Sequence, residues 1–420
     1  MSVDSTRTAG APAAPPGALP AAGHEPGSPA ARRVVAALFA AGLATFAQLY
    51  SVQAVLPALA GGLRVSAAHA ALSVSVATGA LALSVVGWSA LADRVGRVPV
   101  MVVSALAATA VGLVVPWVPG LGALLLLRAV QGAALGGLPA VAMAYLAEEL
   151  AAGQVARAAA AYVAGTSLGG LSGRVVSALV ADLAGWRWGV AAVAVLGAAG
   201  TAVLCAVVPR AQGFAPRRRT GPHLVRRLRE ALADPALLAL YAQGALLMGG
   251  FVTVYNYLGF RLLAPPFSLS QTVVGLLFVV YLAGTASSAV AGRFAARGRL
   301  PVLLAATGVF AAGALLTLAD ALVLVGAGLV LLTAGFFAAH AVASGWVGAR
   351  ARPGARAQAS ALYTFGYYAG SSVLGWAGGV VMGAGGWSGA VTGVVALAAA
   401  AALVAALLLR RDAAAGSMGA

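Results

Sequence analysis

The stretch Ser89-Ala90-Leu91-Ala92-Asp93-Arg94-Val95-Gly96-Arg97 lies where two apolar runs meet, 68–92 and 99–118. Each run has about the 20 mostly apolar residues that a helix needs to cross a bilayer. The acid and the two arginines make the junction polar, and the glycine permits a tight turn. The stretch therefore predicts two closely packed membrane-spanning helices joined by a short charged turn.

The composition of the whole chain agrees with a membrane protein. The 420 residues are 61% hydrophobic and 9% charged, and a water-soluble protein of this kind would expose large apolar patches. The formal net charge of +16 comes from arginines placed singly between apolar runs, which is not the clustered pattern of a nucleic-acid-binding protein. A single cysteine, Cys205, excludes an intrachain disulfide and a cysteine metal site.

Apolar runs long enough to span a membrane recur along the chain, and within lipid such segments form helices or closed barrels. The predicted helices occupy residues 34–58, 68–92, 99–118, 121–149, 156–181, 187–208, 236–262, 271–293, 301–319, 322–349, 357–381 and 388–409. The sequence thus predicts an all-α integral membrane protein with twelve transmembrane helices. The Ala-, Pro- and Gly-rich residues 1–31 are predicted to be a disordered N-terminal tail, and 411–420 a C-terminal tail.

The arginines predict the orientation, because basic loops stay on the cytoplasmic side. With both termini cytoplasmic, three of the 26 basic residues fall outside (Arg64, Arg187 and Arg261), and Arg128 and Arg174 lie within helices. The remaining 21 fall in cytoplasmic segments. This asymmetry supports both the number of helices and the predicted location in a bacterial plasma membrane.

The longest polar interruption divides the chain into two similar halves. Residues 209–235 are predicted to form a basic cytoplasmic linker between six-helix bundles at 32–208 and 236–410. An internal repeat supports this division: residues 162, 165, 169, 185 and 186 are Tyr, Gly, Gly, Gly and Trp, as are residues 363, 366, 370, 386 and 387. Two parallel six-helix halves are typical of transporters that bind substrate between them, near the membrane midplane.

Four motifs resemble those of the major facilitator superfamily. The stretch 89–97 resembles its signature loop, with Ser89 at a position usually held by glycine. Residues 128–132, Arg-Ala-Val-Gln-Gly, resemble the arginine motif of the drug:proton antiporter branch. Residues 165–174 resemble its glycine-rich motif, although Gly170 and Arg174 replace a proline and a glycine. The run 336–340, followed by Tyr363, Tyr367, Tyr368 and Gly370, resembles a subgroup of bacterial inner-membrane efflux carriers.

The resemblance implies two pseudo-symmetric six-helix bundles and a secondary active transporter that exports small amphipathic organic compounds by alternating access. It leaves proton coupling open. It implies a small-molecule substrate, a lipid bilayer as surroundings, no nucleic-acid partner, no cofactor, no metal and a monomeric chain. A major facilitator importer or uniporter is the nearest alternative. A channel is a further alternative, and an integral-membrane enzyme would need a nucleophile with a base or a metal cluster, neither of which the sequence indicates.

Three groups of candidate functional residues follow. A conformational latch at helix ends is predicted for Asp93, Arg94, Gly96, Arg97, Glu148 and Glu149, the alternative being a loop that only orients the helices. Polar and aromatic side chains within helices are predicted to line a substrate or proton pathway: Arg128, Gln131, Gln48, Gln53, Arg174, Asn256, Tyr281, His340 and Tyr367. Interhelical hydrogen bonding is the alternative for these, and a headgroup location is the alternative for Arg128. Close helix packing is predicted at Gly165, Gly169, Gly173, Gly366 and Gly370.

The acidic residues restrict proton coupling. All ten carboxylates fall in tails, loops or helix ends: Asp4, Glu25, Asp93, Glu148, Glu149, Asp182, Glu230, Asp234, Asp320 and Asp412. His340 is therefore the deep side chain whose ordinary pKa of about 6.5 lies nearest physiological pH. If protons drive transport, His340 or the carboxylates at the cytoplasmic helix ends must carry them.

Overall fold

The computed structural model describes residues 23–25, 27–212, 222–352 and 355–410, and most of them are helical. The helices are α1 (Pro29–Leu49), η1 (Gln53–Val55), α2 (Leu56–Leu63), α3 (Ala67–Val95), α4 (Arg97–Val114), η2 (Val115–Trp117), α5 (Leu121–Leu135), α6 (Gly137–Glu149), α7 (Ala152–Ala184), α8 (Trp186–Val207), α9 (Pro222–Ala233), α10 (Pro235–Leu263), α11 (Gln271–Leu276), η3 (Leu277–Val280), α12 (Tyr281–Ala295), α13 (Arg299–Leu316), α14 (Leu322–Arg350) and α15 (Arg356–Leu408).

These helices form twelve membrane crossings within the described residues. Eleven helical stretches are long and apolar enough to cross a membrane, and the last of them is α15, which has 53 residues. The backbone of α15 breaks at Gly386, where φ is 61° and ψ is −159°, so α15 comprises two crossings. A φ in this region strains side chains other than glycine. The twelve-helix prediction is confirmed.

The two halves repeat the same helix packing. A Cβ atom on Gly169 of α7 would lie closer than 3.0 Å to the backbone of Leu43 in α1. A Cβ atom on Gly370 of α15 would lie equally close to the backbone of Ala245 in α10. Gly370 follows Gly169 by 201 residues, and Ala245 follows Leu43 by 202 residues. The fold is therefore two pseudo-symmetric bundles, as the repeat predicts.

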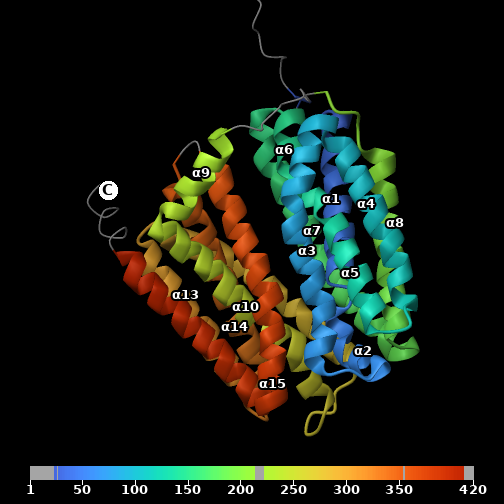
Figure 1. Ribbon diagram of the computed structural model, residues 1–420, viewed down its shortest axis with the longest axis vertical. Coiled ribbons are helices and arrows are strands. Elements are labelled where there is room, and N and C mark those ends of the chain that lie inside the picture. Colours follow the sequence, from blue (N-terminus) through green and yellow to red (C-terminus); the bar gives the residue numbers. More distant parts are fainter. Residues whose placement is uncertain (1–22, 26, 213–221, 353–354, 411–420) are drawn as a thin grey trace, which may run out of the picture.

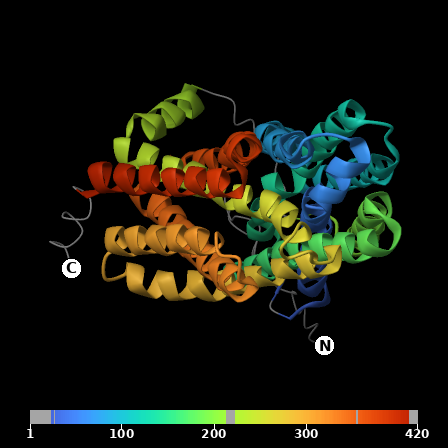
Figure 2. The same cartoon turned by 90° about the horizontal axis from the view of Figure 1, so that it is seen from below.

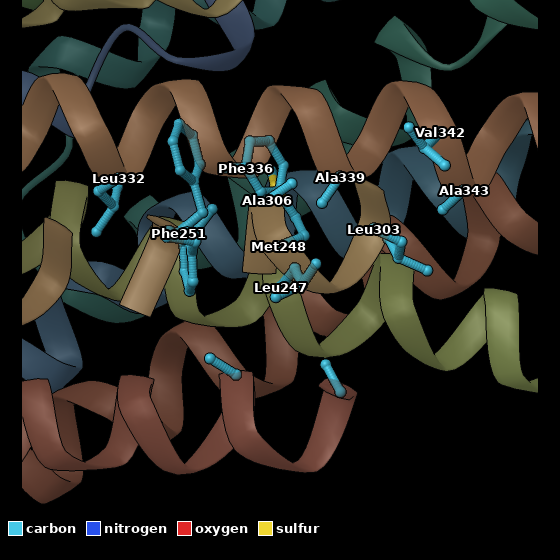
Figure 3. Packing of buried hydrophobic residues seen from close by; sticks show 14 of the residues in the cluster. Leu247, Met248, Phe251, Leu303, Ala306, Leu332, Phe336, Ala339, Val342 and Ala343 are labelled. Carbon is cyan, nitrogen blue, oxygen red and sulfur yellow. The ribbon is translucent and has the colours of Figure 1, made fainter. Parts of the chain in front are cut away.

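Each half has its own apolar core. In the second half, α10, α13 and α14 meet around the side chains in Figure 3, where Phe251 and Phe336 stack with ring centroids 4.1 Å apart. In the first half, Leu38, Met101 and Tyr145 belong to a separate cluster between α1, α4 and α6. Burial of such large side chains packs each bundle as a unit.

The halves lie side by side and touch mainly toward one end (Figures 1 and 2). We call the end that carries the Asp93–Arg97 turn and α9 the basic end, and the end that carries α2 and α11 the far end. The hydrogen bonds between halves in the described residues lie toward the far end: Gln53 with Asn256, Gln271 with Ala54, Thr272 with Asp182, and Ser372 with Ser75 and Thr78. In Figure 1 the two bundles diverge toward the basic end.

The segments outside the bundles differ in part from the sequence interpretation. Helix α9 lies inside the predicted linker 209–235, and α1 begins at Pro29, within the predicted tail 1–31. The prolines at the starts of both helices suit a first helical turn, where a backbone N–H has no partner to lose. Residues 1–22 and 411–420 of the predicted tails lie outside the described residues.

Candidate functional site

A network of charges joins three helices at the basic end. Gly96 ends α3 with φ at 101°, a conformation that favours glycine, so α4 can turn back at once. The guanidinium of Arg97 then lies between two carboxylates, with Nη1 2.7 Å from Asp93 Oδ1 and Nη2 3.0 Å from Glu148 Oε1. These side chains come from α4, α3 and α6, so the network ties the ends of three helices together.

The other predicted latch residues lie beside this network. Arg94 is exposed. Glu149 is buried and accepts a hydrogen bond of 2.8 Å from the backbone N–H of Gln212, and its carboxylate lies 3.8 Å from His24 Nε2. Glu149 thus contacts the segments that precede α1 and follow α8.

The second half has a different arrangement at the basic end. Asp234 caps α10 by accepting from the Ala236 N–H at 3.0 Å, and its carboxylate lies 2.9 Å from Arg350 Nε at the end of α14. Burial by itself would raise the pKa of Asp234, but the hydrogen bonds from Arg350 and Ala236 outweigh it and lower that pKa below its usual value. Position 295, which corresponds to Asp93, is alanine. Each half therefore has its own ionic link.

We expect Asp93→Asn to slow transport while leaving the amount of folded protein unchanged. The amide removes one charge from the Arg97 network but leaves Glu148 in place, so the rate should fall roughly 2- to 10-fold. Solute exchange in proteoliposomes at equal protein levels measures this. The control is Asp320→Asn, which removes a largely exposed carboxylate paired with Arg261 at the far end. Normal exchange in Asp93→Asn would mean that the turn only orients the helices.

Arg128 is fully buried inside the first half. Its Nε donates to the Ser73 carbonyl at 3.0 Å, and its Nη1 donates to the Gln48 carbonyl at 3.0 Å and to Gln131 Oε1 at 2.6 Å. Its Nη2 donates to the Leu49 carbonyl. Gln48 and Leu49 end α1, where backbone carbonyls have no partner within the helix. The guanidinium supplies those partners and holds α1, α3 and α5 together.

Two of the predicted pathway glutamines extend this buried network. The amide nitrogen of Gln131 lies 3.3 Å from Gln48 Oε1, and the amide nitrogen of Gln48 lies 3.4 Å from the Thr109 hydroxyl. Thr109 in turn lies 2.9 Å from Thr201. All these residues belong to the first half. Arg128, Gln131 and Gln48 are therefore brought together, but between helices of one bundle and not between the two bundles.

Arg174, Gln53 and Asn256 form a second polar chain that crosses between the halves. The Nε of Arg174 donates to Gln53 Oε1 at 2.7 Å, and the Gln53 amide donates to Asn256 Oδ1 at 2.7 Å. Arg174 and Gln53 lie on α7 and η1, whereas Asn256 lies on α10. All three residues are buried. We call this row of hydrogen-bonded side chains the crossing chain, and it lies next to the far-end contacts.

Aromatic rings from the second half surround the same arginine. The carbon of the Arg174 guanidinium lies 4.7 Å from the centroid of Tyr281 and 5.0 Å from that of Phe278, and Tyr50 of the first half lies on it at 4.0 Å. Such placement over ring faces favours a cation. Tyr281 continues into a larger group of rings, which we call the aromatic set: Phe251, Tyr255, Phe278, Tyr281, Phe336, Phe337, His340, Tyr363 and Tyr367.

The remaining predicted pathway residues lie in the aromatic set. The ring of His340 lies 5.0 Å from Tyr367, and its Nδ1 lies 2.9 Å from the hydroxyl of Tyr363. His340 and Tyr367 also contact Phe336, which links them to the core of the second half. The structure thus separates the predicted pathway residues into a polar set inside the first half, a crossing chain, and the aromatic set in the second half.

Sequence reasoning missed Tyr50 and Phe278 as neighbours of Arg174. Phe278 stands three residues before Tyr281, and residues three apart on a helix share a face, so this spacing was a usable signal. Tyr50 carried no such signal, because α1 ends at Leu49 and the next helical turn, η1, begins at Gln53.

A cavity lies within the first half. A groove of about 910 Å³ runs between α1, α7 and α8, and its lining is almost entirely apolar, including Phe39, Leu43 and Val203. Only residues of the first half line it. It therefore does not contain the crossing chain or the aromatic set.

Among the described residues, no three His, Cys, Asp or Glu side chains come together in a way that would hold a metal ion.

Comparisons with known proteins agree with this architecture. The family model of the Major Facilitator Superfamily matches residues 38–266. The inner membrane transport protein YnfM of Escherichia coli (strain K12) is 41% identical over 364 residues, covering 86% of this chain and 87% of that protein. The uncharacterized MFS-type transporter YybF of Bacillus subtilis (strain 168) is 37% identical over 366 residues, covering 87% of this chain and 90% of that protein.

Solved structures show the same fold. A bacterial homolog of the human lysosomal transporter Spinster, in an inward-facing and unoccupied conformation, superposes with a TM-score of 0.74 at 15% identity, covering 91% of this chain and 96% of that one. A mutant form of the nucleoside transporter NupG superposes with a TM-score of 0.73 at 14% identity, covering 90% of this chain and 99% of that one. Because the family model matches and relatives of 41% and 37% identity align along most of its length, this chain belongs to the Major Facilitator Superfamily of multi-pass membrane transporters.

Proposed function

We propose that the protein exports small amphipathic organic compounds across the bacterial cytoplasmic membrane by alternating access. Its basic end, with both termini, faces the cytoplasm, because arginine-rich loops stay on that side. The far end then faces outward. Transport proceeds by rocking of the two bundles about a site between them.

The distribution of contacts between the halves supports the alternating-access part of this proposal. At the far end the bundles are joined by hydrogen bonds such as Asp182 with Thr272, whose side-chain oxygens are 2.6 Å apart. At the basic end, the ionic networks around Arg97 and Asp234 each lie within one half. With the basic end on the cytoplasmic side, this arrangement corresponds to an inward-facing state. The opposite state requires the far-end contacts to separate.

A reversible cross-link at the far end tests the rocking motion. We expect Asp182→Cys with Thr272→Cys, in a Cys205→Ala background, to lose nearly all solute exchange when a short bifunctional thiosulfonate reagent joins the two thiols. Reduction of the cross-link should restore the exchange. Counterflow in proteoliposomes against a chemically diverse set of solutes measures it.

The matched control is a cross-link within one bundle. Trp117 of η2 and Trp188 of α8 are exposed neighbours in the first half, with ring centroids 5.1 Å apart. Joining Trp117→Cys to Trp188→Cys should therefore slow exchange far less than the far-end cross-link does. Undiminished exchange in the protein cross-linked at the far end would exclude alternating access. A flux that never saturates would instead indicate a channel.

Proton coupling has few candidate carriers, because the carboxylates among the described residues lie in loops, near helix ends or on α9 at the basic end. That placement favours a uniporter as the second candidate function. An importer is distinguished from an exporter by the direction of the flux that a gradient drives. If protons are coupled, His340 is the proposed carrier, held by Tyr363 within the aromatic set.

We expect His340→Gln to retain substrate binding but to flatten the dependence of transport on a pH gradient. Glutamine preserves a hydrogen-bonding side chain near Tyr363 but cannot take up a proton near neutral pH. Flux into proteoliposomes at several imposed pH gradients measures this, with Asp320→Asn as the control. An unchanged pH response with wild-type flux would remove His340 from the coupling mechanism.

A further inference from the structure

We propose that Arg174 binds the anionic group of the transported solute, so that the substrate is an aromatic or similarly flat organic carboxylate. This inference rests on the proposed transport function and adds the charge of the substrate to it. It concerns a position where the glycine-rich antiporter motif ends in arginine instead of glycine.

The hydrogen bonding of Arg174 leaves one edge of its guanidinium without a described acceptor. Its Nε donates to Gln53 Oε1 at 2.7 Å, and its Nη1 donates to the Gly170 carbonyl at 2.7 Å. Among the described residues, no hydrogen-bond acceptor is assigned to Nη2. An N–H of Nη1 and both of Nη2 remain, and that edge matches the two oxygens of a carboxylate.

The charge of Arg174 is not balanced by the protein around it. The residue is only 3% exposed, and in the described part of the chain no carboxylate comes within ion-pair distance of it. The nearest acid along α7, Asp182, lies about two turns away and accepts from Thr272. Ring faces favour the cation but supply no negative charge. A buried cation in this situation is stabilised by an anion that arrives with the substrate.

Tyrosines from both halves complete a binding surface for a flat ring. Tyr50, Tyr367 and Tyr368 pack in one cluster, with the rings of Tyr367 and Tyr368 5.2 Å apart, and Tyr50 and Tyr281 both lie against the Arg174 guanidinium. None of these four hydroxyls has an assigned hydrogen-bond partner within the described residues, and Tyr281 and Tyr367 are partly exposed. Ring faces beside free hydroxyl donors suit an aromatic carboxylate, because both its apolar ring and its oxygens find partners.

The same surroundings disfavour a cationic solute. An organic cation would meet the Arg174 charge at short range, without a carboxylate in the membrane interior to offset it. The structure therefore predicts a preference for anions over neutral isosteres, and for both over cations.

Three probes of similar shape test this preference in the full-length protein. Benzoate, benzamide and benzylamine are titrated calorimetrically into the purified wild-type transporter in detergent. We expect benzoate to bind about 10- to 100-fold more tightly than benzamide, as a charge-assisted bidentate contact predicts, and benzylamine to bind more weakly still. Equal affinity for the three, tighter binding of benzylamine, no binding of benzoate, or full competition by excess chloride would each overturn the inference.

Variants then locate the contact. Arg174→Gln should lower benzoate affinity about 10- to 100-fold with benzamide affinity unchanged, and Arg174→Lys should restore part of the loss. Arg187→Gln is the matched control, because this arginine lies at the far end over Trp186 and outside the aromatic set. Unaltered benzoate binding in monodisperse Arg174→Gln would contradict the assignment. If Arg174→Gln does not fold, the benzoate affinity of Arg174→Lys and the wild-type preference for benzoate over benzamide test the assignment instead.

The two proposals fail separately. Counterflow of neutral or cationic solutes, with no binding of benzoate, would refute the anion site and leave transport standing. Exchange that survives the far-end cross-link would refute alternating access whatever the affinity for benzoate.

Discussion

Replacement of Arg128 by alanine is expected to reduce the yield of folded protein sharply, in addition to abolishing transport. The guanidinium donates four hydrogen bonds, three of them to the backbone carbonyls of Ser73, Gln48 and Leu49. Ser51 also donates to the Gln48 carbonyl, and Ser73 lies within α3, so the Leu49 carbonyl is the one left without a described partner. An unpaired carbonyl in a dry interior costs about 1–3 kcal/mol, and the removed side chain also leaves a cavity. This loss is a large fraction of the roughly 5–15 kcal/mol that stabilises a typical protein.

Size-exclusion yield and thermal unfolding in detergent measure this effect. The apparent Tm should fall by about 10 °C or more. Arg128→Lys should rescue little, because one ammonium cannot reach carbonyls on two helices as the planar guanidinium does. Arg187→Ala is the control, since Arg187 donates one described hydrogen bond, to the Val118 carbonyl. A well-folded Arg128→Ala protein that fails only in transport would instead assign Arg128 to the substrate.

The second large effect is expected from one added methyl group. A Cβ atom at position 370 would lie closer than 3.0 Å to the backbone of Ala245, and a backbone cannot rotate away as a side chain can. In Gly370→Ala, α15 and α10 must therefore move apart along their contact. Overpacking of this kind costs about 1–3 kcal/mol, and the loss should appear in both thermal stability and exchange rate.

The chain contains a matched control on the same helix. Gly383 also belongs to α15, but nothing lies within 4 Å of the position that its Cβ would occupy. Gly383→Ala should therefore leave stability and transport near the wild-type values. If Gly370→Ala were equally harmless, the close approach of α10 and α15 would be absent from the functional protein.

The fold was predictable because lipid imposes simple requirements. Length and apolarity predict the helices, and the recurrence of Gly169 as Gly370 predicts the paired bundles. The glycine signal is clear because two helix backbones in close contact leave no room for a side chain. Of the predicted packing glycines, Gly165, Gly169, Gly173 and Gly370 would each place a Cβ within 3.0 Å of a neighbouring backbone, whereas at Gly366 the distance is 3.2 Å.

The candidate site was less predictable, because a small backbone irregularity decides which way a side chain points. Gln48 and Gln53 lie five residues apart in one apolar run, and both are expected from the sequence to line the same pathway. The helix ends at Leu49 and resumes as η1 at Gln53. Gln48 consequently points into the first half, whereas Gln53 bonds to Asn256 of the second. Nothing in the apolarity of the run marks this break.

The paired glycines also bear on the history of the molecule. If the halves descend from one duplicated ancestor, helix contacts have persisted while side-chain chemistry has drifted apart. The counterparts of Gln53 and Gln131, 202 residues later, are Tyr255 and Thr333, whose hydroxyls lie 2.7 Å apart. Two positions that carry amides in one copy thus carry a phenol and an alcohol in the other.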